Sequence, residues 1–199
     1  QIDKDLKGEE LIARAGDLGV KFLFEEIIQD CKAIGINYDY IVHENELQKQ
    51  ASVILKQLEE KGVLKKSEGA LWFAPKSEFL KDREAVVIKS DGSYTYFMAD
   101  VVYHTEKFKS GYDLVIDVFG SNTSGHVPKL QALAEVSGFD LSNFKVILYQ
   151  FVRIKRGQEV VKMSKRTGNF VTTREVLDEV GKDALRFFIL MFDNNTHLD

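Results

Sequence analysis

The sequence predicts an α/β fold in which a mostly helical segment leads into a β-α-β unit. Apolar residues recur at a helical period up to about residue 62, and from about residue 70 they fall into short runs typical of strands. The run at 114–119 is followed by small polar residues, a helical pattern with Pro128 near its start and a further run at 144–151. We therefore expect two parts, a mostly helical connecting segment over 1–69 and a β-α-β part over 70–199.

Two helices are expected in the first part. The earlier one begins near residue 9, and the later one begins at Asn45 and ends at Gly62. Each carries an apolar stripe at helical spacing, which predicts one buried face. The stripes consist of Val20, Leu23, Phe24, Ile27, Ile28 and Cys31 in the first helix and of Leu47, Ala51, Ile54 and Leu58 in the second. Because Cys31 is the single cysteine, it has no disulfide partner within the chain, and its place on the stripe favours packing over redox chemistry.

Further short elements follow in the second part. Residues 151–155 and 158–161 flank a short turn and are expected to form a hairpin. Beyond it, Thr172 and Glu175 have the spacing of a capping box, which predicts a helix that starts after Thr172 and ends at Gly181. Additional strands are expected at 70–73, 85–89 and 94–97.

The composition is that of a globular protein. With 199 residues, of which 44% are hydrophobic and 11% aromatic, the chain can build one large core or two small ones. A formal net charge of −4 argues against a strong polyanion-binding platform. No apolar run is long enough to span a membrane and the first residues lack the hydrophobic stretch of a signal peptide, so we expect a cytoplasmic protein. No cluster of Cys, His and carboxylate residues has the spacing of a metal site.

The run Lys162-Met163-Ser164-Lys165-Arg166 places two lysines and a hydroxyl on a short loop between the expected hairpin and the expected helix. Such fixed cations suit a reaction in which negative charge develops on a leaving pyrophosphate, because they stabilise the transition state more than the ground state. The alternative is an ordinary solvated basic loop.

Several blocks of the sequence carry a resemblance to one family. They are Glu68–Phe73, Asp82-Arg83, Ser90–Phe97, Asp100 with Tyr103-His104, Lys162–Thr172 and Glu179–Phe187. Together they resemble the class I aminoacyl-tRNA synthetases, and within that class the arginyl-tRNA synthetases. The resemblance implies the second half of a Rossmann-like catalytic domain, preceded by the helical segment 1–69, with the lysine loop and the helices after it in 70–199.

The resemblance also implies an activity. An arginine–tRNA ligase joins L-arginine to ATP as arginyl-adenylate and transfers the arginine to tRNA(Arg). Lys162 and Lys165 would stabilise the triphosphate as pyrophosphate leaves, Ser164 would help to hold the loop, and Mg²⁺ would arrive with ATP. The nucleotide would contact Gly120, Asn122, His126, Phe151, Val152 and Met163.

The turn from Gly120 to His126 is rich in small polar residues and lies between an expected strand and an expected helix. Glycine lets the backbone approach a ligand, and the start of the following helix offers free N–H groups. The matching turn of the family usually carries Asp-His-His where this chain has Asn122-Thr123-Ser124. A charge-assisted bond to the ATP ribose would therefore be lost, which costs about 1 kcal/mol. Ordinary turn chemistry is the alternative.

Tyr96 and Asp100, at the end of the expected strand 94–97, match the pair that recognises the substrate guanidinium in the family. A carboxylate accepts the planar fork of a guanidinium through two hydrogen bonds, and a phenol can bond or stack beside it. The alternative is that Tyr96 packs in the core and Asp100 caps a helix. His104 is expected to be a satisfied surface histidine.

Class I synthetases also carry a His-Ile-Gly-His type of motif, but no two histidines of this sequence are three apart. We therefore expect the chain to be an internal piece of the catalytic domain that is inactive alone and meets tRNA(Arg) only through the intact protein.

Two rival classes stay open. A cysteine-specific class I synthetase should carry zinc-ligand cysteines, against which the single Cys31 counts, and a non-enzymatic module would bind nucleotide or RNA without chemistry.

Overall fold

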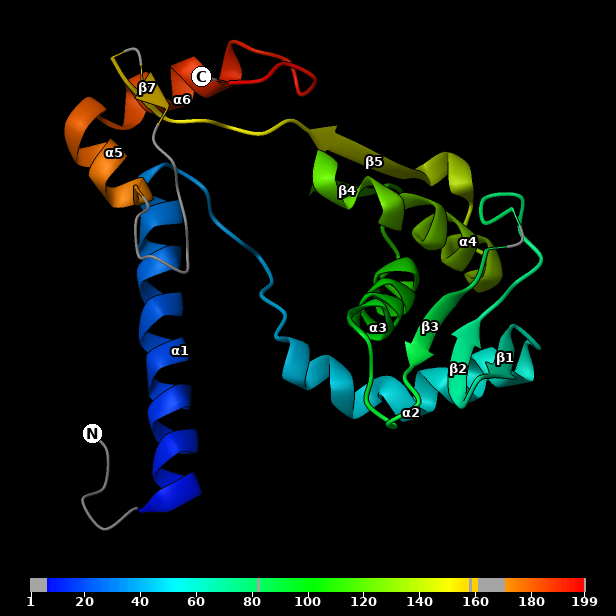
Figure 1. Ribbon diagram of the computed structural model, residues 1–199. Helices are drawn as coiled ribbons and strands as arrows, with labels where there is room; N and C mark the ends of the chain where they lie inside the picture. The colour runs from blue at the N-terminus through cyan, green and yellow to red at the C-terminus, as the bar shows by residue number, and fades with distance from the viewer. Residues whose placement is uncertain (1–6, 82, 158, 161–170, 199) are drawn as a thin grey trace. The chain divides into compact units, whose positions relative to one another are not determined.

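The computed structural model describes residues 7–81, 83–157, 159–160 and 171–198, which form two compact units (Figure 1). Unit 1 comprises Gln1–Tyr40, Val152–Asp193 and Leu198–Asp199, and unit 2 comprises Ile41–Phe151 and Asn194–His197. This division differs from the boundary expected after residue 69. The reason is that helix α2 (Glu44–Glu60) packs against helix α3 (Tyr96–Lys109) and so joins the β-α-β part.

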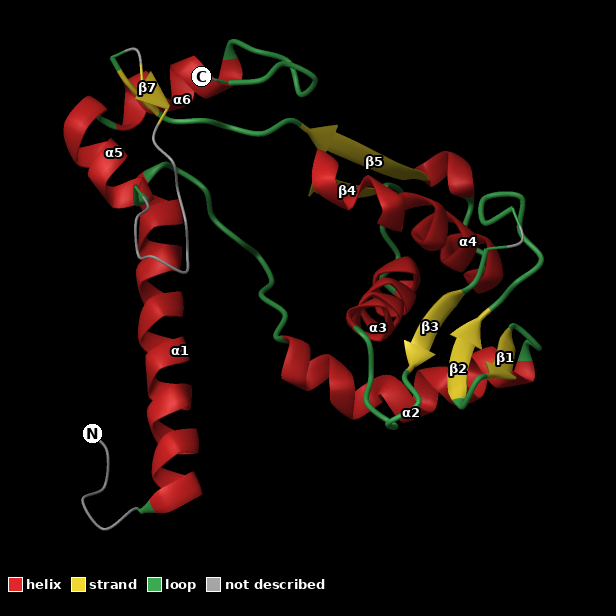
Figure 2. Cartoon of the chain, in the orientation of Figure 1, coloured by secondary structure: helices red, strands yellow, loops and turns green. Residues whose placement is uncertain are grey.

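The predicted β-α-β unit is present in unit 2 (Figure 2). Its two strands pair in parallel, with Val115 opposite Phe144 and Gly120 opposite Tyr149. The carboxyl ends of both strands therefore lie at one edge, which is where α/β folds bind ligands. The elements are, in chain order, strand β4 (Val115–Gly120), the 3-10 helix η1 (Ser121–His126), helix α4 (Val127–Ser137), the 3-10 helix η2 (Leu141–Asn143) and strand β5 (Phe144–Tyr149).

The core of unit 2 lies between its helices and an antiparallel sheet. Ala51, Ile54 and Leu58 of α2 are buried as the stripe predicted, although the helix begins one residue before Asn45. Completely buried large side chains, such as Leu133 of α4, each stabilise the fold by about 1.5–3 kcal/mol. The sheet has the order β1-β2-β3 and consists of β1 (Leu64–Ser67), β2 (Ala70–Phe73) and β3 (Ala85–Ile88).

Residues 94–97 do not form the predicted strand, because α3 begins at Tyr96. Thr95 is the N-cap of this helix, and its Oγ1 accepts a hydrogen bond from the Met98 amide at 3.2 Å. The aromatic residues around Thr95 favour a strand, but the hydrogen bond that its side chain accepts from a free amide of the first turn stabilises the helix instead. As a result, Tyr96 and Asp100 lie one turn apart on a helix instead of at the end of a strand.

Unit 1 combines a long helix with a hairpin and two short helices. The hairpin is confirmed in a shorter form than predicted, with Lys155 paired to Val160 and Arg156 paired to Glu159. Arg186 Nη1 donates to the carbonyl oxygen of Ile34 at 2.7 Å and so ties the last helix to the end of the first. The elements are α1 (Gly8–Ala33), β6 (Lys155–Arg156), β7 (Glu159–Val160), α5 (Thr173–Val180) and α6 (Lys182–Leu190).

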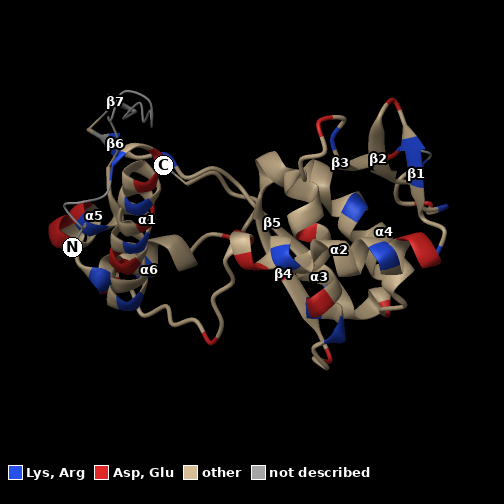
Figure 3. Ribbon diagram, turned by 90° about the horizontal axis from the view of Figure 1, so that it is seen from below, with Lys and Arg blue, Asp and Glu red and all other residues tan. Residues whose placement is uncertain are grey.

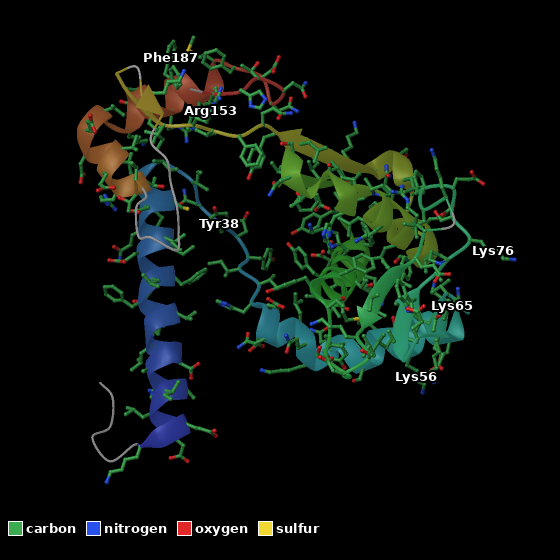
Figure 4. All side chains as sticks on the ribbon, in the orientation of Figure 1. Tyr38, Lys56, Lys65, Lys76, Arg153 and Phe187 are labelled. Carbon is green, nitrogen blue, oxygen red and sulfur yellow. The ribbon has the colours of Figure 1, made fainter. Side chains whose placement is uncertain are left out.

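The apolar stripe of α1 is largely exposed, contrary to the prediction of a buried face. Val20, Leu23 and Ile27 are 67%, 59% and 56% exposed, and none of the residues of α1 is buried in the described part of the chain. Phe187 of α6 likewise extends from the ribbon and is 72% exposed (Figure 4). A stripe is buried only where another element covers it, and the polar contacts of α1 with α5 and α6 gather at its end. Cys31, also on the stripe, is half-buried.

The capping box predicted before α5 is confirmed. Thr172 Oγ1 accepts from the Glu175 amide at 3.1 Å, and Glu175 Oε2 accepts from the Thr172 amide at 2.7 Å. The helix then runs to Val180, and Gly181, with φ of 80°, ends it as predicted.

Thr172→Ala is expected to make the first turn of α5 fray. The loss of an N-cap costs about 1 kcal/mol, so hydrogen exchange of the Glu175 amide should become about fivefold faster. Thr173→Ala is the matched control, because Thr173 is exposed and alanine suits a helix. Equal exchange rates in the two variants would show that the cap contributes nothing.

Candidate functional site

Tyr96 and Asp100 occupy the first turns of α3. Residues four apart on a helix share one face, so the phenol and the carboxylate are neighbours. Tyr96 is 81% exposed and therefore does not pack in the core. Asp100 is not the helix cap, since Thr95 has that role. The geometry thus favours the pair as an accessible polar site over the alternative of a core tyrosine and a capping aspartate.

The carboxylate of Asp100 is oriented by a histidine from another element. Nδ1 of His126, the last residue of η1, lies 3.1 Å from Oδ2 of Asp100, and each of the two side chains is 37% exposed. The two residues are 26 positions apart in sequence. The packing of α4 against α3 brings them together.

The turn after β4 is closed by its own side chains. Thr123 Oγ1 donates to the carbonyl oxygen of Gly120 at 2.7 Å. A Cβ at Gly120 would stand 2.7 Å from Oδ1 of Asn122 and 3.7 Å from the hydroxyl of Tyr149, so any larger residue would force Asn122 to move. Because the close contact is with the end of an exposed side chain, Asn122 could move aside at little cost. Asn122 and Tyr149 both lie beside Gly120 at the carboxyl edge of β4 and β5.

A buried polar cluster lies behind Asp100. His104, expected at the surface, is only 2% exposed; its Nδ1 is 2.8 Å from the carbonyl oxygen of Asp100 and its Nε2 is 2.8 Å from Oδ2 of Asp117. A carbonyl and a carboxylate are both acceptors, so both ring nitrogens donate. Lys107 Nζ donates to the other oxygen of Asp117 at 2.5 Å. The cluster connects the backbone of the Tyr96–Asp100 site to strand β4.

Asp117 is ionised in this cluster. Burial by itself would raise the pKa of Asp117, but the hydrogen bond and charge of His104, followed by those of Lys107, outweigh burial and hold this pKa below its ordinary value of 3.8. Neither Asp117 nor Lys107 was among the residues predicted from the sequence. The sequence did contain a signal for them, since a carboxylate stands inside the apolar run 114–119. A carboxylate buried in a strand needs hydrogen-bonding or charged partners, so its position could have indicated a polar cluster.

The residues expected to contact ATP are divided between the units. Gly120, Asn122 and His126 lie in or beside η1, and Phe151, at the end of unit 2, is 58% exposed. Val152 belongs to unit 1, where it forms a bridge with Leu198. The lysine-loop residues fall outside the described residues; these are Lys162, Met163, Ser164 and Lys165.

Three general properties bear on the site. Among the helices that the structure describes, none is long and apolar enough to cross a membrane. Within the same part of the chain, His, Cys, Asp and Glu side chains form no group of three that could hold a metal ion. In the view of Figure 3, acidic and basic residues are interspersed along the helices, without a face of one sign.

Comparison with known protein families decides the assignment. The family described as tRNA synthetases class I (R), catalytic domain, matches residues 17–197. The chain belongs to this family. The predicted resemblance to class I arginyl-tRNA synthetases is thereby confirmed, as is the α/β fold of a class I synthetase catalytic domain, and the cysteine-specific rival is set aside.

Individual arginyl-tRNA synthetases agree with this membership. An arginine–tRNA ligase of Thermotoga maritima is 40% identical over 197 residues, which cover 98% of this chain and 36% of the relative. A solved structure from Campylobacter jejuni, described as an arginyl-tRNA synthetase, is 33% identical with a TM-score of 0.85, over 98% of this chain and 42% of that chain. The Thermus thermophilus arginyl-tRNA synthetase, 18% identical with a TM-score of 0.71 over 96% of this chain and 43% of its own, shares the fold. The chain thus spans about a third of the length of the curated relatives it matches.

Proposed function

We propose that this chain is the part of an arginine–tRNA ligase that recognises the guanidinium of L-arginine. The observation that carries the proposal is the accessible pair Tyr96 and Asp100 at the start of α3, in a chain of the arginyl-tRNA synthetase family. A carboxylate accepts two parallel N–H groups of a guanidinium, and a neighbouring phenol can bond or stack beside it. The single ammonium of lysine would not match this fork.

The proposal places ATP at the carboxyl edge of β4 and β5. The backbone of Gly120 and the neutral amide of Asn122 would face the ribose, and the remaining contacts are those expected from the sequence, with His126, Phe151, Val152 and Met163. Mg²⁺ usually binds through substrate phosphates and few protein carboxylates, so we propose that it arrives with ATP. When bound with ATP, Mg²⁺ would neutralise phosphate charge.

The proposed activity is that of a whole enzyme, since the chain covers 36% of the Thermotoga maritima relative. The whole enzyme that contains this chain would activate L-arginine with ATP to arginyl-adenylate and transfer the arginine to tRNA(Arg) in the cytoplasm. The chain alone is proposed to be inactive. Arginine-dependent ATP–pyrophosphate exchange, measured with the whole enzyme and with lysine in place of arginine, tests the proposal; exchange that does not depend on arginine would contradict it.

Lys165→Ala in the whole enzyme is expected to lower the rate constant of adenylation by about 100-fold or more and to leave arginine affinity nearly unchanged. The reason is that Lys162 and Lys165 are proposed to act on charge that develops only as pyrophosphate leaves. Lys165→Arg should restore part of the rate, because a guanidinium keeps the charge but not the compact geometry of an ammonium. Single-turnover adenylate formation measures the effect.

The matched control is Lys145→Ala, which removes an exposed lysine of β5. Both alanine variants should unfold within about 0.5 kcal/mol of the parent, as surface substitutions usually do. A rate constant unaffected by Lys165→Ala, or a loss of rate explained by unfolding, would leave 162–166 as a solvated basic loop.

A further inference from the structure

Asp100 is held at two points by two histidines. His104 donates to its backbone carbonyl at 2.8 Å from within α3, and His126 contacts its carboxylate at 3.1 Å from the end of η1. The two contacts differ in exposure: His104 is 2% exposed, whereas the side chain of His126 is 37% exposed. Of these two histidines, only His126 is open to solvent and contacts the carboxylate that a ligand would bind.

The contact with His126 bears directly on guanidinium recognition. A guanidinium fork uses both oxygens of a carboxylate, and Oδ2 of Asp100 already faces Nδ1 of His126. A neutral imidazole that donates through Nδ1 orients the carboxylate and leaves its charge for the ligand. An imidazolium neutralises that charge and places a second cation beside the incoming guanidinium.

We infer that His126 is a positioning and specificity-determining residue for arginine: neutral His126 orients the Asp100 carboxylate for the guanidinium, and protonated His126 competes with the guanidinium for it. The inference rests on the proposed function. It adds to the expected role of His126 beside ATP a role in the amino-acid site. Its consequence is that arginine binds more weakly when His126 is protonated than when it is neutral.

Among the described residues, other charged groups of α3 and α4 have partners of their own. On α3, His104 and Lys107 bind Asp117 of β4. On α4, the Lys129 ammonium lies over the ring of Phe97, 5.3 Å from its centre. The hydroxyl of Tyr149 on β5 faces Gly120. Because His104 also contacts Asp100, through the backbone carbonyl, the test has to change His126 while leaving His104 in place.

The test compares the whole wild-type enzyme with His126→Asn and His126→Phe between pH 6 and 8.5. Asparagine keeps a neutral N–H donor, and phenylalanine keeps a flat ring without one. In the wild-type enzyme the arginine KM in ATP–pyrophosphate exchange should rise at least about fivefold from pH 8 to pH 6, while the ATP KM stays level. His126→Asn should lose the rise in arginine KM between pH 8 and pH 6, whatever its KM at pH 8. His126→Phe should have a raised KM at every pH.

Calorimetry of arginine binding gives a readout independent of turnover. Arginine should release protons at pH 6.5 in the wild-type enzyme, because binding favours neutral His126, and should release none in His126→Asn. An equal pH dependence in wild type and His126→Asn, or an equal change for ATP, would overturn the inference while leaving the proposed function intact. Absence of arginine-dependent exchange in the wild-type enzyme would overturn both.

Discussion

Asp100→Asn in the whole enzyme is expected to weaken arginine binding by about 2–5 kcal/mol and to leave ATP binding nearly unchanged. An affinity loss of this size is about 30-fold to several thousand-fold. The physical reason is that the substitution leaves the guanidinium without the carboxylate that would pair with it. Asparagine keeps the shape of the side chain and one acceptor oxygen, so the variant isolates the charge. Arginine and ATP affinities measured by calorimetry on the same preparations check the result.

Two further variants serve as comparisons for Asp100→Asn. Tyr96→Phe should cost about 1 kcal/mol, because only a neutral hydrogen bond is lost. Asp113→Asn makes the same chemical change at an exposed position outside the site and should change neither affinity. Small and equal losses for arginine and ATP in Asp100→Asn would mean that Asp100 has only a structural role as the partner of His126.

Asp117→Asn is expected to lower the free energy of unfolding by about 3–5 kcal/mol at neutral pH. The substitution removes the negative charge that lies between His104 and Lys107, and the side chain of Asp117 is 2% exposed, so solvent cannot replace the carboxylate. His104 would then be buried without its anionic partner. Urea unfolding of the 199-residue chain measures the loss, with Asp113→Asn as the exposed control, expected within about 0.5 kcal/mol of wild type.

The stabilisation by Asp117 should depend on pH with a definite sign. Because the pKa of Asp117 is lowered on folding, its contribution is complete above the ordinary value of 3.8 and is lost as pH falls from there through the lower folded pKa. The stability difference between wild type and Asp117→Asn should therefore narrow as pH falls below about 4. Lys107→Met changes the partner whose side chain is 21% exposed and should cost only about 1 kcal/mol. This variant keeps the test usable if Asp117→Asn does not fold. A difference that is constant down to pH 3 would contradict the ion cluster.

Local features of the fold were accessible from the sequence. The capping box of Thr172 and Glu175 needs only four consecutive residues, and the structure forms it as predicted. The β-α-β unit was likewise predicted, because the apolar runs and Pro128 mark the elements without knowledge of their partners. The prediction of a strand over 94–97 was wrong, also for a local reason. The aromatic residues there favour a strand, but Thr95 caps the first turn of a helix through its hydrogen bond with the Met98 amide.

The order and type of most elements, the family resemblance and the candidate residues for the proposed chemistry could therefore be predicted from the sequence. Three features became visible only in the folded chain: the contact of His126 with Asp100, the burial of His104 against Asp117, and the exposure of the α1 stripe in the described part of the chain. The physical reason is that periodicity and capping depend on neighbours along the chain, whereas these contacts join α3 to η1 and to β4. Such pairs form only when separately specified helices and strands pack together, and no local pattern encodes which side chains then meet.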